Sequence, residues 1–430
     1  MKSSYKKLGP YIRETSVKNS DNAIEKLLGV SITKKFIPSI ANTVGTDLSK
    51  YKIVRKGQFA YGPVTSRNGE KISVALLEEG DCILSTSYTV FELTNKEELD
   101  PEYLMMWFRR SEFDRYARYM SHGSVREIFG WEEMCGVELP IPDIETQREI
   151  VREYNVIVDR IKLNEQLCTK LEETAQALYK HWFVDFEFPI SAEYAASIGK
   201  PELEGKPYKS SGGEMKLCSK LDKKLPATWG VGGLHDIAEL IDGDRGSNYP
   251  SKTEYQEDGH CLFLSTSNVT KTGFLFDENN FISKERDSAL RKGKLIRGDI
   301  VLTTRGTVGN SAYYSKLIEY DHMRINSGMI IVRGHSNAEY SPYIYVRLNS
   351  TEMAQAIGTF LSGSAQQHLP IRDIKVIPLP LPEESTIQFA NNKLRTIVSH
   401  IDHLRKDIRS LKVSSHVLLA LMTKSERLAA

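Results

Sequence analysis

The chain repeats itself, and this repeat limits its possible folds more than any other feature. Tyr103–Pro142 aligns without a gap on Tyr343–Pro382, a shift of 240 residues, and both segments end in Leu-Pro-x-Pro. Upstream the shift becomes 241, where Lys56–Phe59 falls on Arg297–Ile300. The sequence therefore predicts two copies of one domain.

Further upstream the correspondence is weaker, and Leu8–Ile12 falls on Leu234–Ala238 at a different shift. Identity between the copies is low, so the alignment depends on the positions of glycine, proline, aromatic and apolar residues. The alignment alone leaves chance similarity between two α/β segments as an alternative. The pattern that follows each copy favours the repeat.

A heptad pattern follows each copy and predicts a long helix. In the first copy the apolar or near-apolar positions, alternately four and three residues apart, are Ile150, Tyr154, Ile157, Ile161, Asn164, Cys168, Leu171, Ala175, Leu178 and Trp182. In the second copy they are Ala390, Leu394, Ile397, Ile401, Leu404, Ile408, Leu411, Ser415, Leu418 and Met422. A sustained period of 3.5 residues is typical of a coiled-coil seam. We expect helices of roughly 35–40 residues, each about 50–60 Å long.

Connectivity predicts that the two helices pack antiparallel. Each helix begins where its globular domain ends, so parallel packing would bring both domains to one end, where they would collide. Antiparallel packing places them at opposite ends, related by an approximate two-fold axis. Asn164 interrupts the first seam, where it either fixes the register at some cost in stability or faces a gap or solvent.

Short strand-like runs dominate each globular copy, while Pro101–Arg118 and Pro342–Thr359 are predicted to be helical. We therefore expect a mixed α/β (α+β) fold, with two pseudo-two-fold-related domains separated by a long antiparallel two-helix coiled coil. The expected boundaries are 1–142 for the first domain, 143–184 for the first long helix, 185–225 for an irregular linker, 226–382 for the second domain, 383–424 for the second long helix and 425–430 for a tail.

Composition and charge argue for an ordinary globular protein. Hydrophobic residues make up 40% and charged residues 26%, with a formal net charge of +1. This balance counts against coating nucleic acid through bulk charge, although a basic face could be offset by acidic residues elsewhere. No apolar signal core or run of about 18 uncharged apolar residues occurs, so no membrane role is expected. The five cysteines form no C-x-x-C pair and fit reduced thiols in a cytoplasm.

The motifs of a catalytic protein are missing from the sequence. No G-x-x-x-x-G-K-[ST] loop, no G-x-G-x-x-G turn between a strand and a helix, and no N-P-P-Y tetrapeptide occurs. His400 and His403 lack an acidic third ligand at helical spacing, and Asp373-Ile374-Lys375 is a lone match to a nuclease-like D-x-K pattern. We therefore expect neither catalytic residues nor a metal site.

Each copy holds loops that mix Arg or Lys with amide, hydroxyl and glycine residues, which suit contacts to base edges and phosphates. In the first copy the DNA-binding candidates are Lys34, Lys35, Ser66, Arg67, Asn68, Ser121, His122, Ser124 and Arg126. In the second copy they are Arg245, Asn248, Tyr249, Thr304, Arg305, Thr307, Ser364, Gln366, Gln367 and His368. Corresponding loops carry different residues, as reading two different short sequences requires. Two such readers suit half-sites whose centres lie about 34 Å apart per helical turn.

With these features the chain is similar to the specificity (S) subunits of type I restriction–modification systems. The resemblance covers essentially the whole chain. Besides the two Leu-Pro-x-Pro motifs and their heptad helices, it is carried by Lys180–Phe186, Gly205–Met215 and Leu225–Trp229. The first domain departs from the pattern, because it begins at Tyr5–Leu8 without a Leu-Pro-x-x-Trp entry.

The resemblance implies two target recognition domains that read a bipartite, asymmetric site on double-stranded DNA. It also implies that the long helices dock two methyltransferase (M) subunits and that restriction/translocase (R) subunits join the complex. The chain would then be a non-catalytic subunit that binds no cofactor itself. S-adenosylmethionine, ATP and Mg²⁺ would belong to the partner subunits.

Two functions of other classes stay open on the sequence. The first is a stand-alone DNA nuclease or methyltransferase, which turnover by the purified protein with DNA, Mg²⁺ and a methyl donor would favour. The second is a coiled-coil protein–protein scaffold, which a failure to bind DNA even beside methyltransferase partners would favour.

Overall fold

The computed structural model describes residues 5–39, 45–66, 68–69, 71–123, 126–335, 340–361 and 368–422. The chain divides into two compact units. Unit 1 comprises Met1–Leu163 and Arg409–Ala430, and unit 2 comprises Asn164–Ile408. Both predicted long helices are therefore shared, and each unit contains one segment of each helix.

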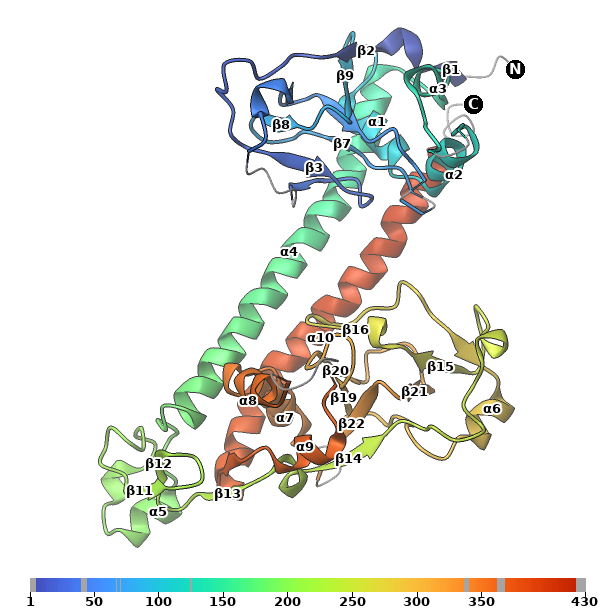
Figure 1. Ribbon diagram of the computed structural model, residues 1–430. Helices are drawn as coiled ribbons and strands as arrows, with labels where there is room; N and C mark the ends of the chain where they lie inside the picture. Colours follow the sequence, from blue (N-terminus) through green and yellow to red (C-terminus); the bar gives the residue numbers. More distant parts are fainter. Residues whose placement is uncertain are drawn as a thin grey trace. The chain divides into compact units, whose positions relative to one another are not determined.

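The two long helices form as predicted (Figure 1). Helix α4 spans Ile144–Phe183 and helix α10 spans Glu384–Leu421. Asp143 caps α4, since its carboxylate accepts the N–H of Thr146 at 2.9 Å. Ser385, which is followed three residues later by Gln388 as in a capping box, lies inside α10 and not at its start.

The helices pack against each other antiparallel within each unit. In unit 1 the early α4 residue Tyr154 shares a core with Leu419, near the end of α10. In unit 2 the late α4 residue Tyr179 shares a core with Ile387, near the start of α10. All predicted seam residues are buried or half-buried, and so are Val151, Val158, Tyr179, Phe183 and Leu419 beside the seam. The apolar stripe is wider than a coiled-coil seam because the helices also carry the globular parts of the units.

Unit 1 is built around a four-stranded antiparallel sheet in the order β2-β9-β6-β7, with the pairs β1–β10, β3–β4 and β5–β8 beside it. Its strands are β1 (Tyr5–Lys7), β2 (Ile12–Thr15), β3 (Leu28–Val30), β4 (Phe36–Pro38), β5 (Lys52–Val54), β6 (Phe59–Tyr61), β7 (Val74–Leu76), β8 (Cys82–Leu84), β9 (Thr89–Leu93) and β10 (Glu138–Pro140). Its short helices are α1 (Pro101–Phe108), α2 (Ser111–Tyr119) and α3 (Trp131–Cys135). Phe59 and Phe91 stack at 4.9 Å in the core, which includes residues of α1 and α4.

Unit 2 contains the matching sheet β14-β22-β19-β20, together with the sheet β18-β15-β21 and the pairs β11–β12, β13–β23 and β16–β17. Its strands are β11 (Met215–Cys218), β12 (Lys223–Pro226), β13 (Gly230–Gly232), β14 (Ala238–Asp242), β15 (Cys261–Leu264), β16 (Val269–Thr270), β17 (Gly273–Phe274), β18 (Phe281–Ile282), β19 (Ile300–Thr303), β20 (Ser311–Tyr313), β21 (Met323–Ile325), β22 (Met329–Gly334) and β23 (Leu379–Leu381). Its short helices are α5 (Ala192–Ser197), α6 (Lys284–Ala289), α7 (Ser341–Leu348), α8 (Thr351–Leu361) and α9 (Ile371–Val376).

Strand register confirms the internal repeat. Ala60 pairs with Val90 in unit 1, and the residues 241 positions later, Val301 and Ile331, pair in unit 2. The weak upstream match also holds in three dimensions. Ile12 pairs with Leu93, and Ala238 pairs with Gly334, which lies 241 positions after Leu93.

The predicted helix in each copy is in fact two helices. The first copy has α1 and α2, and the second has α7 and α8, with the break at the same place in both. In unit 2 the buried Ser350 accepts the N–H of Met353 at 3.2 Å and so begins a new helix.

The segment 185–225 is not an irregular linker, because it folds onto unit 2. Phe188 stacks on Tyr208 at 4.7 Å and on Trp229 at 5.1 Å. Tyr208 is 1% exposed and donates its hydroxyl to the carbonyl of Glu214 at 2.9 Å. Glycine and proline mark the turns of this substructure, and its few aromatic residues hold it on the core.

Candidate nucleic-acid interface

Three loops of unit 2 meet around Arg305. The backbones of Arg305 and His368 form an antiparallel bridge. The N–H groups of Thr304 and Arg305 donate to the carbonyl of Gly328 at 2.8 and 3.2 Å, and Leu369 donates to the carbonyl of Thr304 at 2.9 Å. Residues far apart in the sequence are therefore fixed side by side by backbone hydrogen bonds.

Two more loops continue this arrangement. Arg245 donates to the carboxylate of Asp242 at 3.2 Å and lies 3.5 Å from the carbonyl of Ser327. The carboxylate of Asp244 accepts the N–H groups of Gly246 at 2.9 Å and Arg291 at 2.7 Å. We call residues 242–246, 291–293, 304–306, 326–328 and 368 the unit 2 loop row.

The exposed side chains of the unit 2 loop row are mainly basic. Arg245, Arg291, Lys292 and Arg305 are exposed. Burial lowers the pKa of His368, and the charges of Arg305 and Arg245 lower it further. A neutral imidazole presents one donor and one acceptor nitrogen, and each can pair with a group on a base edge.

The structure places the predicted residues of unit 2 in different roles. Arg245, Arg305 and Thr307 are exposed, and His368 is half-buried. Thr304 is 3% exposed and donates its hydroxyl to the carbonyl of Gly328 at 3.0 Å, so its side chain offers little surface for the predicted contact with DNA.

Asn248 and Tyr249 are half-buried in unit 2. The Asn248 amide donates to the carbonyl of Ala289 at 3.1 Å, and the Tyr249 ring packs edge-on against Phe263 at 5.5 Å. The side-chain amide of Asn248 and one edge or face of the Tyr249 ring are therefore already in contact with other residues of unit 2. The predicted residues Ser364, Gln366 and Gln367 lie outside the described residues.

Unit 1 repeats the backbone frame with different side chains. Val64 and Ile128 form the bridge that Arg305 and His368 form in unit 2, and Phe129 donates to the carbonyl of Pro63 at 2.8 Å, as Leu369 does to Thr304. The two loops of each unit therefore meet in the same way, although the residues at the bridge differ.

The predicted residues of unit 1 gather around this bridge. Ser66, His122 and Arg126 are exposed. Asn68 is half-buried and lies 3.4 Å from the carbonyl of Val64, and the Ser121 hydroxyl donates to the carbonyl of Ala117 at 2.7 Å. Arg67 and Ser124 lie outside the described residues.

Lys34 does not belong to the exposed loops of unit 1. It is 8% exposed, and its ammonium contacts the carboxylate of Asp114 at 2.5 Å and the carbonyl of Ile72 at 2.7 Å. Burial lowers the pKa of Lys34, against the opposing effect of Asp114. Burial and the ion pair leave the Lys34 ammonium little surface for the predicted contact with DNA, whereas its neighbour Lys35 is exposed.

Sequence reasoning missed Arg291 and Lys292. They begin the run Arg-Lys-Gly-Lys, in which Gly293 has a φ of +80° and packs so closely that an added Cβ would lie 3.1 Å from Ile325. A basic run around a glycine between a helix and a strand was the available signal, but its proximity to Arg245 depends on the fold.

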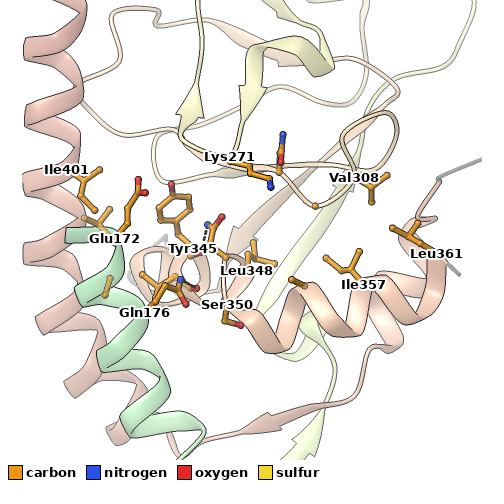
Figure 2. Close-up of a pocket in the computed structure, with 18 residues that line it drawn as sticks. Glu172, Gln176, Lys271, Val308, Tyr345, Leu348, Ser350, Ile357, Leu361 and Ile401 are labelled. Atoms are coloured by element: carbon orange, nitrogen blue, oxygen red, sulfur yellow. Dashed lines mark hydrogen bonds between the residues drawn. The ribbon is translucent and has the colours of Figure 1, made fainter. Parts of the chain in front are cut away.

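A separate cavity of about 430 Å³ lies within unit 2 (Figure 2). Residues of α4, α7, α8 and α10 line it, together with the loop Val308–Asn310. Its wall is mainly apolar, with Ile357, Leu361 and Ile401 among the lining residues. Glu172 lines the cavity and binds Arg405 of α10 at 2.5 Å. This ion pair joins the two long helices within unit 2.

In the described part of the chain, no group of three or more His, Cys, Asp or Glu residues is placed to hold a metal ion. No helix within those residues is long and apolar enough to cross a membrane.

The chain is similar to known proteins in sequence. Residues 226–409 match the sequence model of the type I restriction modification DNA specificity domain. The specificity subunit of the type I restriction enzyme HindI from Haemophilus influenzae is 29% identical over 455 residues, covering 94% of this chain and 96% of that protein. The specificity subunit of the MjaIX enzyme from Methanocaldococcus jannaschii is 23% identical over 339 residues, covering 78% and 71%.

The fold is also similar to a solved structure. The crystal structure of a type I restriction–modification S subunit from M. genitalium aligns over 97% of this chain and 95% of that one, with a TM-score of 0.53 at 14% identity. Both comparisons agree with the resemblance found in the sequence.

Proposed function

Because the chain is similar to the specificity subunits of type I restriction–modification systems over nearly its whole length, we propose that it is such a subunit and that it reads a bipartite, asymmetric site on double-stranded DNA. Each unit would read one half-site through the loops at its backbone bridge. The observation that carries this proposal is the shared frame, in which Val64–Ile128 and Arg305–His368 are equivalent bridges with different side chains. Two readers with one frame and different residues would recognise two different half-sites.

The exposed residues around each bridge would make the contacts. In unit 1 these are Lys35, Ser66, His122 and Arg126, joined by the half-buried Asn68 and Ser121. In unit 2 they are Arg245, Arg305 and Thr307, joined by His368. Arginine can form two parallel hydrogen bonds with guanine, which makes Arg245, Arg305 and Arg126 the strongest candidates for base recognition.

The long helices would dock the partner subunits. In unit 1, Val156 of α4 is 70% exposed and Val413 of α10 is 64% exposed, although both lie on helices whose other faces are packed. Leu163 and Val417, two turns and one turn further along, are exposed as well. Exposed apolar rows of this kind mark protein contacts, and we propose that methyltransferase subunits cover them.

The chain itself would be non-catalytic. We propose that two methyltransferase subunits supply the S-adenosylmethionine site and that restriction/translocase subunits supply the sites for ATP and Mg²⁺. Partners that enclose the DNA would also share in binding its phosphates, which accounts for a DNA reader with a net charge of +1.

Genome-wide mapping of methylated bases tests the proposed function. We expect one bipartite, asymmetric motif to lose its methylation when this gene is deleted and to regain it when the gene is restored. Methylation unchanged by the deletion would contradict the proposal.

Purified components separate the two rival functions. Methylation or cleavage by the chain alone would show a stand-alone enzyme. Failure to bind DNA even beside the methyltransferase subunits would show a scaffold.

A further inference from the structure

We infer that Arg291 and Lys292 bind phosphates of the DNA backbone beside the half-site that unit 2 reads. This inference rests on the proposed function and assigns a role to residues outside the predicted recognition loops. It separates the unit 2 loop row into two parts. Arg245, Arg305 and His368 would contact bases, while Arg291 and Lys292 would hold the duplex in place whatever its sequence.

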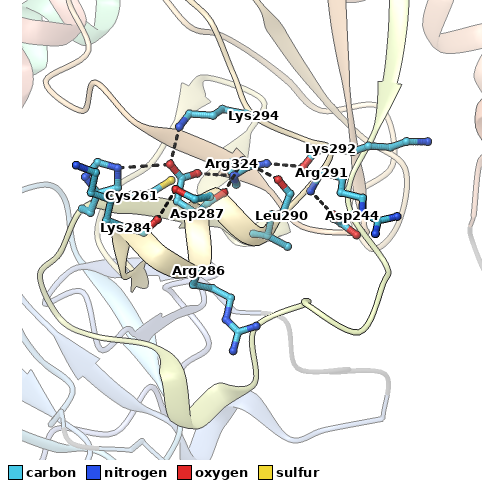
Figure 3. Close-up of polar contacts among 12 residues, drawn as sticks. Asp244, Cys261, Lys284, Arg286, Asp287, Leu290, Arg291, Lys292, Lys294 and Arg324 are labelled. Atoms are coloured by element: carbon cyan, nitrogen blue, oxygen red, sulfur yellow. Dashed lines mark hydrogen bonds and ion pairs between the residues drawn. The ribbon is translucent and has the colours of Figure 1, made fainter.

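A buried ion cluster holds the segment that carries these two residues (Figure 3). Asp287 is 2% exposed and contacts both Arg324 and Lys294 at 2.5 Å. The Arg324 guanidinium also donates to the carbonyls of Lys292 at 2.7 Å and Leu290 at 3.1 Å. A buried charge with this many partners fixes the path of the backbone between α6 and β19.

Backbone hydrogen bonds fix the same segment from both sides. The N–H of Arg291 donates to the Asp244 carboxylate at 2.7 Å, and Ile325 donates to the carbonyl of Gly293 at 2.9 Å. The Arg291 N–H and the carbonyls of Lys292 and Gly293 are therefore bonded inside the protein, and the backbone that carries the Arg291 and Lys292 side chains is held in place.

Those two side chains are exposed and held next to a recognition loop. Neither forms a hydrogen bond or an ion pair with any residue that the structure describes. Figure 3 shows the Lys292 side chain extending away from the ion cluster. Two cations on a rigid backbone, with no acidic partner of their own, suit the charge of consecutive phosphates.

The repeat supplies independent support. Ile53 pairs with Ile83 in unit 1, and the residues 241 positions later, Lys294 and Arg324, form a bridge in unit 2. The same shift places Lys50 at the position of Arg291, and Lys50 is exposed. The residues at the recognition bridges differ between the copies, but this position is basic in both. A contact with DNA phosphates does not depend on the base sequence, so a basic residue at this position would serve both copies.

The test compares the wild type with Arg291→Ala/Lys292→Ala in the complete complex with its methyltransferase subunits. Binding to a duplex with the cognate site and to one without it is measured between low and high salt. Each lost phosphate contact lowers the slope of log affinity against log salt by about 0.9, so the double variant should lose about 1.8. Affinity should fall by the same factor on both duplexes, and the methylated motif should not change.

Lys220→Ala/Lys224→Ala is the matched control, because it removes two exposed lysines from the hairpin β11–β12 of the same unit. It should leave the salt slope unchanged. An unchanged slope in the Arg291/Lys292 variant would overturn the inference, and so would a change in the bases that unit 2 recognises. If the wild-type complex showed no preference for its site, the proposed function itself would fail.

Discussion

Arg324 in unit 2 occupies the place that Ile83 holds in unit 1. Each lies in the middle of an equivalent strand, β21 or β8, and the two are 241 positions apart. Ile83 pairs with Ile53, whereas Arg324 pairs with Lys294 and both cations bind Asp287. One backbone frame therefore holds an apolar pair in one copy and a buried ion cluster in the other.

We predict that Asp287→Ala strongly destabilises unit 2. Removing the carboxylate leaves Arg324, which is 5% exposed, as an uncompensated buried charge. Losing one partner of a buried pair costs roughly 3–5 kcal/mol. Urea unfolding of wild type and variant measures this difference.

The control for this change is Asp321→Ala. Asp321 binds Arg297 at 2.7 Å, but its side chain is 85% exposed, so its loss should cost less than about 1 kcal/mol. Equal effects of the two substitutions would show that burial of the Asp287 cluster contributes nothing.

The Asp287 cluster also predicts a pH dependence. Burial alone would raise the pKa of Asp287, but hydrogen bonds from Lys294 and Arg324 and their charges outweigh it and bring the pKa to about 2. Because the pKa is lower in the folded protein than its ordinary value of 3.8, the contribution to stability is complete above pH 3.8 and is lost as the pH falls towards 2. The difference in unfolding free energy between wild type and Asp287→Asn should thus shrink in that window and stay constant between pH 5 and 7. A difference in unfolding free energy that increases as the pH falls would contradict this prediction.

We predict that Arg305→Ala changes recognition of one half-site alone. A lost pair of hydrogen bonds to a base costs roughly 1–3 kcal/mol of discrimination. Methylation mapping should show relaxed preference at one position of that half-site. Arg126→Ala, in the loop of unit 1 that corresponds to the His368 loop, should relax the other half-site instead. If both variants methylated the unchanged motif, these loops would not be the ones that recognise the bases.

The helix pair should set the spacing between the half-sites. One heptad inserted into each helix, after Leu163 and after Ile408, keeps the seam in phase and adds about 10.5 Å at 1.5 Å per residue. At about 3.4 Å per base pair, this corresponds to roughly three more base pairs of spacer, or to lost binding if the partners cannot follow. The half-site sequences should stay the same. A functional variant with its original spacer would reject a measuring role for the helices.

We predict that Asn164 lowers the thermal stability of the protein. It is 1% exposed, and both of its side-chain polar atoms are buried without a hydrogen-bond partner among the described residues. The sequence left open whether Asn164 fixes the register or faces a gap or solvent, and its burial excludes solvent. Because an unsatisfied buried amide costs about 1–3 kcal/mol, Asn164→Leu should raise the melting temperature. The neighbouring exposed Glu165→Leu is the control and should have little effect. A lower melting temperature for Asn164→Leu would indicate that Asn164 makes an essential contact.

Periodic features were readable from the sequence, because they depend on residues close together along the chain. The heptads predicted both long helices, and their repetition at 240 residues predicted two copies of one domain. The bridges Val64–Ile128 and Arg305–His368 lie in loops that the alignment had matched. A repeat keeps its spacing even when its side chains change, so spacing was a reliable guide.

Only the tertiary structure decided which polar residues are free to act. Lys34 and Lys35 are adjacent in sequence, yet Asp114, some 80 positions away, buries one and leaves the other exposed. The Thr304 hydroxyl is hydrogen-bonded to the carbonyl of Gly328. The Asp244 carboxylate accepts the N–H of Arg291 and so holds Arg291 beside the recognition loops. Burial and hydrogen bonding depend on partners that packing brings together from distant parts of the chain, and local sequence does not contain them.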